Sequence, residues 1–189
     1  MSSHHIVRDE QEPALFILDF GNFQEEHLGQ LLEWSPTVLV AQNMYEKISS
    51  MGIKIDVVIC NKHIIEEFQQ GTKILYLNVK DDTLNVGINF FINQKYPAVN
   101  LICNNFNIAS IYHYVNKIDL VIFTKNKKYY PIKTGFKKWS VANLIIEVFG
   151  SKFNSQGLKH LCKSKFTTLN DGFFSLTFTD EFLFLAEDL

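Results

Sequence analysis

Ile55-Asp56-Val57-Val58-Ile59-Cys60 is an almost unbroken apolar run, and it leads directly into Asn61-Lys62-His63. Short runs rich in β-branched residues are typical of strands buried on both faces of a parallel sheet. In an open α/β sheet, ligands bind beyond the carboxyl ends of such strands. A magnesium–nucleotide site there needs carboxylates, because Mg²⁺ prefers hard oxygen ligands. The strand therefore fits an α/β fold, whereas the amide, cation and imidazole that follow it do not fit magnesium chemistry.

The first two-thirds of the chain alternate apolar runs with helical patterns. The runs predict strands at 14–18, 37–41, 56–60, 73–77, 98–103 and 119–123. Amphipathic or capped segments between them predict helices at about 23–33, 44–50, 64–70, 84–93 and 108–116. This alternation predicts an α/β fold with a doubly wound, mostly parallel sheet, although it does not give the strand order.

The pattern changes after Thr124. Short β-like runs at 129–133, 144–149, 173–178 and 182–186 are separated by turn signals, among them Gly135, Gly150 and Asn170-Asp171-Gly172. We expect an α/β domain over 1–124 and a small all-β sandwich or barrel domain over 125–189. Because so small a core is marginal, we expect this domain to pack on the first domain or on a second subunit.

Composition narrows the class of protein. Hydrophobic residues make up 47% of the 189 residues and aromatic residues 14%, which is enough for a packed core. The net charge of −2 gives no reason to expect a nucleic-acid partner. There is no apolar run of about 18 residues and no signal-peptide core, so we expect a cytoplasmic protein without a membrane partner. Cys60, Cys103 and Cys162 are expected to be thiols of a reducing compartment.

Several common mechanisms have no motif in this chain. There is no Gly-x-Gly-x-x-Gly after the first strand and no Gly-x-x-x-x-Gly-Lys-Ser/Thr loop. No Cys/His spacing suits zinc, and no Gly-x-Ser-x-Gly suggests a hydrolase. A phosphate loop, a zinc site and a serine nucleophile are therefore not expected.

Several stretches resemble the thiamine pyrophosphokinase family, of which the chain looks like a diverged member. Asp56-Val57-Val58-Ile59-Cys60-Asn61-Lys62-His63 falls where the family has a strand followed by Gly-Asp-x-Asp-Ser, and Lys80-Asp81-Asp82-Thr83 resembles its Lys-Asp-x-Thr-Asp. Asn154-Ser155-Gln156-Gly157-Leu158-Lys159-His160 resembles the small-domain Thr-x-Gly-Leu-Lys-Tyr. Asn170 and the run at 182–186 resemble the Ser-Asn segment and the terminal strand. The likeness in layout spans most of the chain, but no stretch matches in full.

The resemblance implies a function. The family transfers a pyrophosphoryl group from ATP to thiamine, giving AMP and thiamine diphosphate, with Mg²⁺ held by aspartates at strand ends of the α/β domain. Its members are homodimers that bind thiamine at the interface near the small domain. For this chain it implies a homodimer, thiamine or a related small molecule as ligand, and Mg²⁺ and ATP as cofactors if the chain is active. The resemblance assigns catalysis to Asp81 and Thr83, metal binding to Asp81 and Asp82, and cofactor binding to Asn61, Lys80 and Asn170.

The chain departs from the family at most acidic positions. The family's Asp-x-Asp falls on Asn61 and His63, and the last Asp of its second motif falls on Leu84. Its Asp-Gly-Gly turn falls near Gln42-Asn43-Met44, and its Gly-Gly-Arg-x-Asp-His segment near Asn104-Asn105-Phe106-Asn107. Losing nearly every metal carboxylate removes several strong Mg²⁺ ligands. We therefore expect a thiamine pyrophosphokinase-like binding or scaffolding dimer with catalysis weakened or lost. The alternative is an active thiamine diphosphokinase with a reduced Mg²⁺ site around Asp81, Asp82 and Asn61.

Each candidate also has a structural interpretation. Asp81-Asp82-Thr83 suits the start of a helix as well as a metal site. The Asn104–Asn107 turn can satisfy its own backbone, and Asn170 can shape a turn instead of binding thiamine. Trp139 can pack in a core or stack on a ligand, and Lys125, Lys127 and Lys128 can form a solvated turn or meet phosphate.

Overall fold

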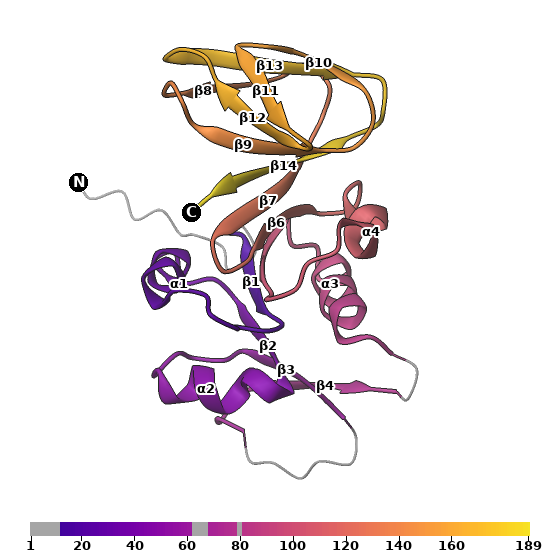
Figure 1. Ribbon diagram of the computed structural model, residues 1–189. Coiled ribbons are helices and arrows are strands. Elements are labelled where there is room, and N and C mark those ends of the chain that lie inside the picture. The colour runs from indigo at the N-terminus through magenta and orange to yellow at the C-terminus, as the bar shows by residue number, and fades with distance from the viewer. Residues whose placement is uncertain (1–11, 62–67, 79–80) are drawn as a thin grey trace, which may run out of the picture. The chain divides into compact units, whose positions relative to one another are not determined.

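The computed structural model describes residues 12–61, 68–78 and 81–189, and the chain forms two compact units, Met1–Lys125 and Asn126–Leu189 (Figure 1). Among the described residues, no helix is long and apolar enough to cross a membrane. By the resemblance, the domain predicted at 1–124 would be of the catalytic type and that at 125–189 of the thiamine-binding type, and both roles stay predictions.

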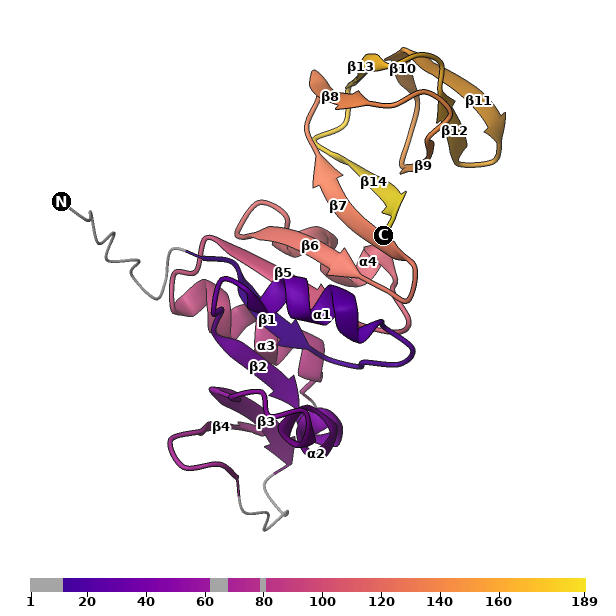
Figure 2. The ribbon, with the colours of Figure 1, turned by 90° about the vertical axis from the view of Figure 1, so that its left-hand side faces the viewer.

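The first unit is built on a six-stranded parallel sheet. Its strands are β1 (Ala14–Ile17), β2 (Val38–Ala41), β3 (Val57–Asn61), β4 (Lys73–Leu77), β5 (Ala98–Ile102) and β6 (Asp119–Phe123). They lie in the order β4-β3-β2-β1-β5-β6, which can be followed in Figure 2, and every neighbouring pair is parallel. The predicted α/β class and the six predicted strands are confirmed, each strand to within one residue. The order reverses at β1, which lies between β2 and β5.

Helices cover both faces of this sheet (Figure 1). Helices α1 (Glu25–Leu32) and α2 (Tyr45–Ser50) lie on one face, and α3 (Thr83–Asn93) and α4 (Ile108–Ile111) on the other. The first face is buried against Leu28 of α1 and Ile48 of α2. On the second face Phe16 of β1 meets Phe91 of α3, with ring centroids 6.5 Å apart. The doubly wound arrangement follows from strands that are apolar on both faces.

Two predicted helices differ from the structure. The helix predicted at 108–116 is α4 followed by a short 3₁₀ helix, Tyr112–Tyr114, because aromatic and β-branched residues there are weak helix formers. Of the helix predicted at 64–70, residues 64–67 lie outside the described residues, and 68–70 are not helical. The Gln69 backbone N–H instead donates to the Tyr45 hydroxyl at 2.6 Å, and its side-chain Oε1 accepts from the Ile55 N–H at 3.2 Å.

The second unit is a β-sandwich. One sheet has the order β11-β12-β9-β14-β7 and the other β10-β13-β8. The strands are β7 (Lys127–Ile132), β8 (Phe136–Ser140), β9 (Ile145–Phe149), β10 (Phe153–Gln156), β11 (Leu158–Cys162), β12 (Lys165–Thr168), β13 (Gly172–Phe178) and β14 (Leu183–Asp188). Apolar side chains of both sheets form one core, which includes Ile146, Leu185, Phe174 and Leu176. The all-β prediction is confirmed, and the sandwich is the form adopted.

An ion-pair cluster joins the two sheets of this unit. The Glu187 side chain on β14 is only 5% exposed. Its Oε2 accepts a hydrogen bond from Lys138 Nζ of β8 at 2.6 Å, and its Oε1 accepts one from the Tyr130 hydroxyl at 3.0 Å. Lys128 Nζ lies 3.5 Å from the same carboxylate. A buried carboxylate therefore has charged and neutral donors from strands of both sheets.

Tyr130 of this cluster and the neighbouring Lys127 predict a loss of stability at alkaline pH. Burial and the Glu187 charge raise the pKa of Tyr130. Burial acts to lower the pKa of Lys127, but its bonds to Glu147 and Asp188 outweigh this and raise the pKa. Since both folded pKa values exceed the unfolded values, the stabilisation is complete below about pH 10 and is lost as the pH rises further. Urea unfolding followed by circular dichroism should show that the free energy of unfolding decreases above about pH 10. In Tyr130→Phe this decrease should be smaller. If the decrease is the same in the variant and the wild type, Tyr130 does not cause it.

Candidate functional site

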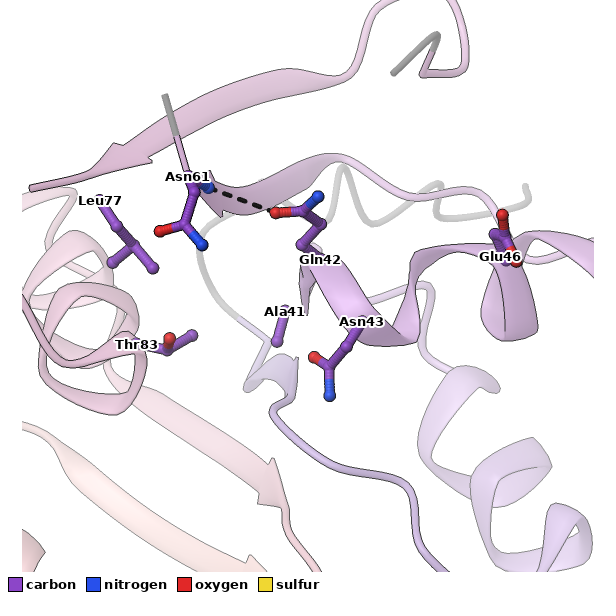
Figure 3. A pocket seen from close by; sticks show the side chains of 7 residues that line it. All are labelled: Ala41, Gln42, Asn43, Glu46, Asn61, Leu77 and Thr83. Carbon is purple, nitrogen blue, oxygen red and sulfur yellow. Dashed lines mark hydrogen bonds between the residues drawn. The ribbon is translucent and has the colours of Figure 1, made fainter. Parts of the chain in front are cut away.

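A cavity of about 480 Å³ lies at the carboxyl ends of β2, β3 and β4, beside the first turn of α3. The side chains around it are mostly uncharged (Figure 3): Ala41, Gln42, Asn43, Glu46, Asn61, Leu77 and Thr83. Its volume lies within the range of small-molecule sites, about 300–1,000 Å³. Its position is the one at which open α/β sheets bind ligands.

Asn61 and Gln42 form one wall of this cavity. Strand β3 continues through Asn61, which is paired with Leu77 of β4. The Asn61 backbone N–H donates to Gln42 Oε1 at 3.3 Å, drawn as a dashed line in Figure 3. Because its backbone is held in the sheet, the Asn61 carboxamide is presented at the strand end from a rigid position. An amide offers a donor and an acceptor but no charge.

Asp81 and Asp82 make local hydrogen bonds just before Thr83. Asp82 is the N-cap of α3, and its Oδ2 accepts from the Asn85 N–H at 3.3 Å. Asp81 Oδ2 accepts from the backbone N–H and the side-chain Nδ2 of Asn78, at 2.8 and 2.9 Å. Among the described residues that line the cavity, Thr83 is present and these two aspartates are not. The structure thus brings Asn61 and Thr83 together, and it uses both carboxylates to shape the β4–α3 connection.

The other residues singled out in the sequence are not among the described residues that line this cavity. Lys80 and His63 are outside the described residues. Asn170 belongs to the second unit, where it is exposed in the bend before β13. The next residue shapes this bend, because Asp171 Oδ1 accepts from the Ala142 N–H at 2.7 Å. Trp139 is 55% exposed, on the outer face of β8.

The cavity wall does not fit a magnesium–nucleotide site of the kind that the resemblance implies. Of its described residues, Glu46 alone carries a carboxylate, and it lies on α2 away from Thr83 (Figure 3). Within the described part of the chain, no three His, Cys, Asp or Glu side chains gather closely enough to hold a metal ion. The remaining oxygens are those of amides and a hydroxyl, and Mg²⁺ is usually held by carboxylates and phosphates. Glu46 had no signal in the sequence beyond its place in a helix.

Beyond β1 and β5, where the strand order reverses, a third aspartate also makes a local hydrogen bond. Asp19 Oδ1 accepts from the Gly21 N–H at 3.0 Å. Gly21 has a φ of +47°, and a Cβ there would lie 2.7 Å from the Asn104 side chain. Burial, with a smaller contribution from the Asp19 charge, raises the pKa of the Cys103 thiol to about 12. The Cys103 thiol is therefore weakly reactive at neutral pH.

The three cysteines should differ sharply in reactivity. Cys60 and Cys103 are buried, whereas Cys162 is exposed on β11. Since the thiolate is the reactive form, the raised pKa of Cys103 adds to its burial. Iodoacetamide at pH 8 should label Cys162 first and the other two only after unfolding, as read by peptide mass spectrometry. Fast labelling of Cys103 in the native protein would contradict this packing.

Removing the α3 cap should lower stability. Asp82→Ala deletes the acceptor for the Asn85 N–H, and loss of such a cap costs about 1 kcal/mol. Urea unfolding should show this decrease, whereas Asp82→Asn, which keeps an acceptor, should stay close to the wild type. Equal losses in the two variants would contradict a capping role.

The fold and the cavity define a class of two-unit protein: a six-stranded parallel α/β sheet followed by a β-sandwich. Solved thiamine pyrophosphokinases share this fold. That of Bacillus subtilis superimposes with a TM-score of 0.69 at 11% identity, covering 94% of this chain and 99% of the other. That of Geobacillus thermodenitrificans gives 0.69 at 8% identity, covering 93% and 97%, and the yeast enzyme gives 0.67 at 11% identity, covering 98% and 88%.

Sequence comparison adds no relative. No family model matches the chain, and no curated protein matches it either. Likeness at these identities shows the fold, so the function depends on the cavity itself.

Proposed function

We propose that this chain is a diverged thiamine pyrophosphokinase-like protein whose strand-end cavity binds a small molecule without pyrophosphoryl transfer. The observation that carries the proposal is the cavity wall, in which amides and a hydroxyl stand at the strand ends. The ligand proposed is thiamine or a nucleotide, by analogy with proteins of the same fold.

The chemistry of the wall supports binding more than catalysis. Pyrophosphoryl transfer depends on neutralising the charge that develops on phosphate oxygens, largely with carboxylate-held metal ions. Asn61 and Thr83 can orient a ligand by hydrogen bonds, but neither supplies a charge. Asp81 and Asp82 would have to give up their bonds to Asn78 and Asn85 before serving a metal.

The alternative is an active thiamine diphosphokinase with a reduced Mg²⁺ site. It is favoured by the position of Asp81, which is exposed and lies two residues before the cavity residue Thr83. Here Asp81, Asp82 and the Asn61 carbonyl would hold Mg²⁺ and so place ATP. This role requires the β4–α3 connection to rearrange.

A turnover assay separates the two functions. The protein is incubated with thiamine and Mg-ATP, with the Bacillus subtilis enzyme as the positive control, and AMP and thiamine diphosphate are measured. We expect no turnover, together with a rise in melting temperature with thiamine or ATP. Thr83→Ala should lose that rise, and Asn93→Ala, an exposed change at the far end of α3, should keep it. Turnover that disappears in Asp81→Ala would establish the alternative, and no thermal shift with any ligand would overturn the binding proposal.

We also propose a homodimer in the cytoplasm. Trp139 and Phe173 are directly opposite each other on β8 and β13, and both are more than half exposed. Exposed paired aromatics on a sandwich face support association. Light scattering during gel filtration should give twice the 21.9 kDa chain mass. A mass of one chain at micromolar concentration would contradict a stable dimer.

A further inference from the structure

A second cavity lies at the opposite edge of the first unit, at the amino ends of β2 and β3. Its volume is about 650 Å³, larger than that of the strand-end cavity. Apolar side chains from four segments form part of its wall: Leu32, Pro36, Val38 and Ile53. Polar groups complete it: Ser35, Thr37, Lys54, Asp56 and Tyr96. None of these residues belongs to the candidate site described above.

The polar groups of this cavity are held in place by hydrogen bonds and by ring packing. Asp56 Oδ2 accepts from the Val38 N–H at 3.0 Å, which fixes the carboxylate at the start of β2. The Tyr96 hydroxyl lies 2.7 Å from Thr37 Oγ1, and the Tyr96 ring packs on Phe91 at 5.2 Å. The wall therefore presents an oriented carboxylate, an oriented pair of hydroxyls and apolar side chains.

The present partner of this carboxylate is easily displaced. Lys54 Nζ lies 2.6 Å from Asp56 Oδ1, but the Lys54 side chain is 86% exposed. Exposed ion pairs contribute little to stability, about 0–1 kcal/mol, because water solvates the lysine equally well. The Asp56 side chain is only 26% exposed, so a cation bound to it from inside the cavity would be better shielded than Lys54 is.

From this geometry we propose that the cavity binds a small aromatic amine. The ligand ammonium replaces Lys54 at Asp56 Oδ1, and its ring packs on Leu32, Pro36 and Ile53. A hydroxyl at the far end of the ligand bonds with the Thr37–Tyr96 pair, in which each oxygen keeps lone pairs for another donor. This site is separate from the proposed function, since it lies at the other edge of the sheet.

Tyramine is the probe that combines these features, and 4-ethylphenol is the same molecule without the ammonium. The test is a titration of the full-length ¹⁵N-labelled protein followed by NMR. With tyramine we expect saturable shifts of the Thr37, Val38 and Ile53 amide signals, and with 4-ethylphenol we expect none. No saturable shift with tyramine in the millimolar range would overturn the proposal.

Three variants separate specific binding from general adhesion. Asp56→Asn keeps an acceptor for the Val38 N–H and should weaken tyramine binding about tenfold. Lys54→Ala removes the competing cation and should strengthen binding about threefold. Thr83→Ala, at the opposite edge, should leave it unchanged. Weaker binding in Lys54→Ala, or unchanged binding in a folded Asp56→Asn, would refute the assigned role of Asp56.

Discussion

Replacing Gly87 by alanine should destabilise the first unit by about 3 kcal/mol, the upper end for overpacking a core. A Cβ at this position of α3 would lie 2.3 Å from Cε1 and 2.5 Å from Cζ of Phe16. The Phe16 ring cannot move aside, because it is fully buried and packs against Phe91. The helix must therefore shift away from the sheet. Urea unfolding followed by circular dichroism measures the loss.

The same substitution in α1 is the matched control. Gly29 is exposed, and a Cβ there would meet nothing within 4 Å. Gly29→Ala should therefore stabilise the chain by about 0.7 kcal/mol, as expected for an exposed helical glycine. Adding Phe16→Leu to Gly87→Ala should recover part of the lost stability, because it shortens the side chain that the new methyl meets. If the Gly87→Ala and Gly29→Ala variants had equal free energies of unfolding, the close packing of α3 on β1 would be contradicted.

Truncating the Glu187 side chain should destabilise the second unit about as much as Gly87→Ala destabilises the first. Glu187→Ala should cost about 3 kcal/mol, as when one partner of a buried ion pair is removed. The variant leaves the Tyr130 hydroxyl and the Lys138 ammonium without their shared acceptor. Urea unfolding again gives the change in free energy.

The neighbouring acid provides the control. Asp188 pairs with Lys127 at 3.2 Å, but its side chain is 61% exposed, so Asp188→Ala should cost less than about 1 kcal/mol. Replacing Glu187 and Lys138 by methionine and Tyr130 by phenylalanine removes the buried polar groups together. We expect this triple variant to be more stable than Glu187→Ala. Equal losses for Glu187→Ala and Asp188→Ala would show that burial of the carboxylate contributes nothing.

The first unit was largely predictable because each of its strands is a separate apolar run. The run at 56–60 predicted β3 to within one residue. Strand order was not predictable, since the hydrogen bonds that place β1 beside β5 connect distant segments and leave no local pattern. In the second unit β8, β10, β11 and β12 were missed. Strands β10 and β11 are mostly exposed, and β8 has two consecutive lysines between Phe136 and Trp139, so none of the three forms an apolar run.

The candidate site was predictable only in part. The resemblance to two family motifs, at 56–63 and 80–83, predicted that Asn61 and Thr83 belong to the site, and both residues line the strand-end cavity. The motif at 80–83 also predicted that Asp81 and Asp82 bind a metal ion. An aspartate that caps a helix and one that holds a metal have the same sequence signal, so the sequence could not separate the two roles. The metal assignment stays a prediction that needs a change of hydrogen-bond partners. Glu46 was missed because a glutamate on a short helix is unremarkable until its neighbours in space are known.

The place of β14 in the sandwich has a consequence for synthesis on the ribosome. This strand follows all the other strands of the second unit in the sequence, yet it lies between β7 and β9 and pairs with both. The first unit can complete its sheet once β6 has left the exit tunnel, whereas β7 and β9 have no shared neighbour until Leu183–Asp188 emerges. Domains generally fold as units in the order of translation, and unpaired strand edges attract other chains. We therefore expect chains that stop shortly before β14 to contain a folded first unit and a second unit whose β7 and β9 edges stay unpaired, which favours aggregation.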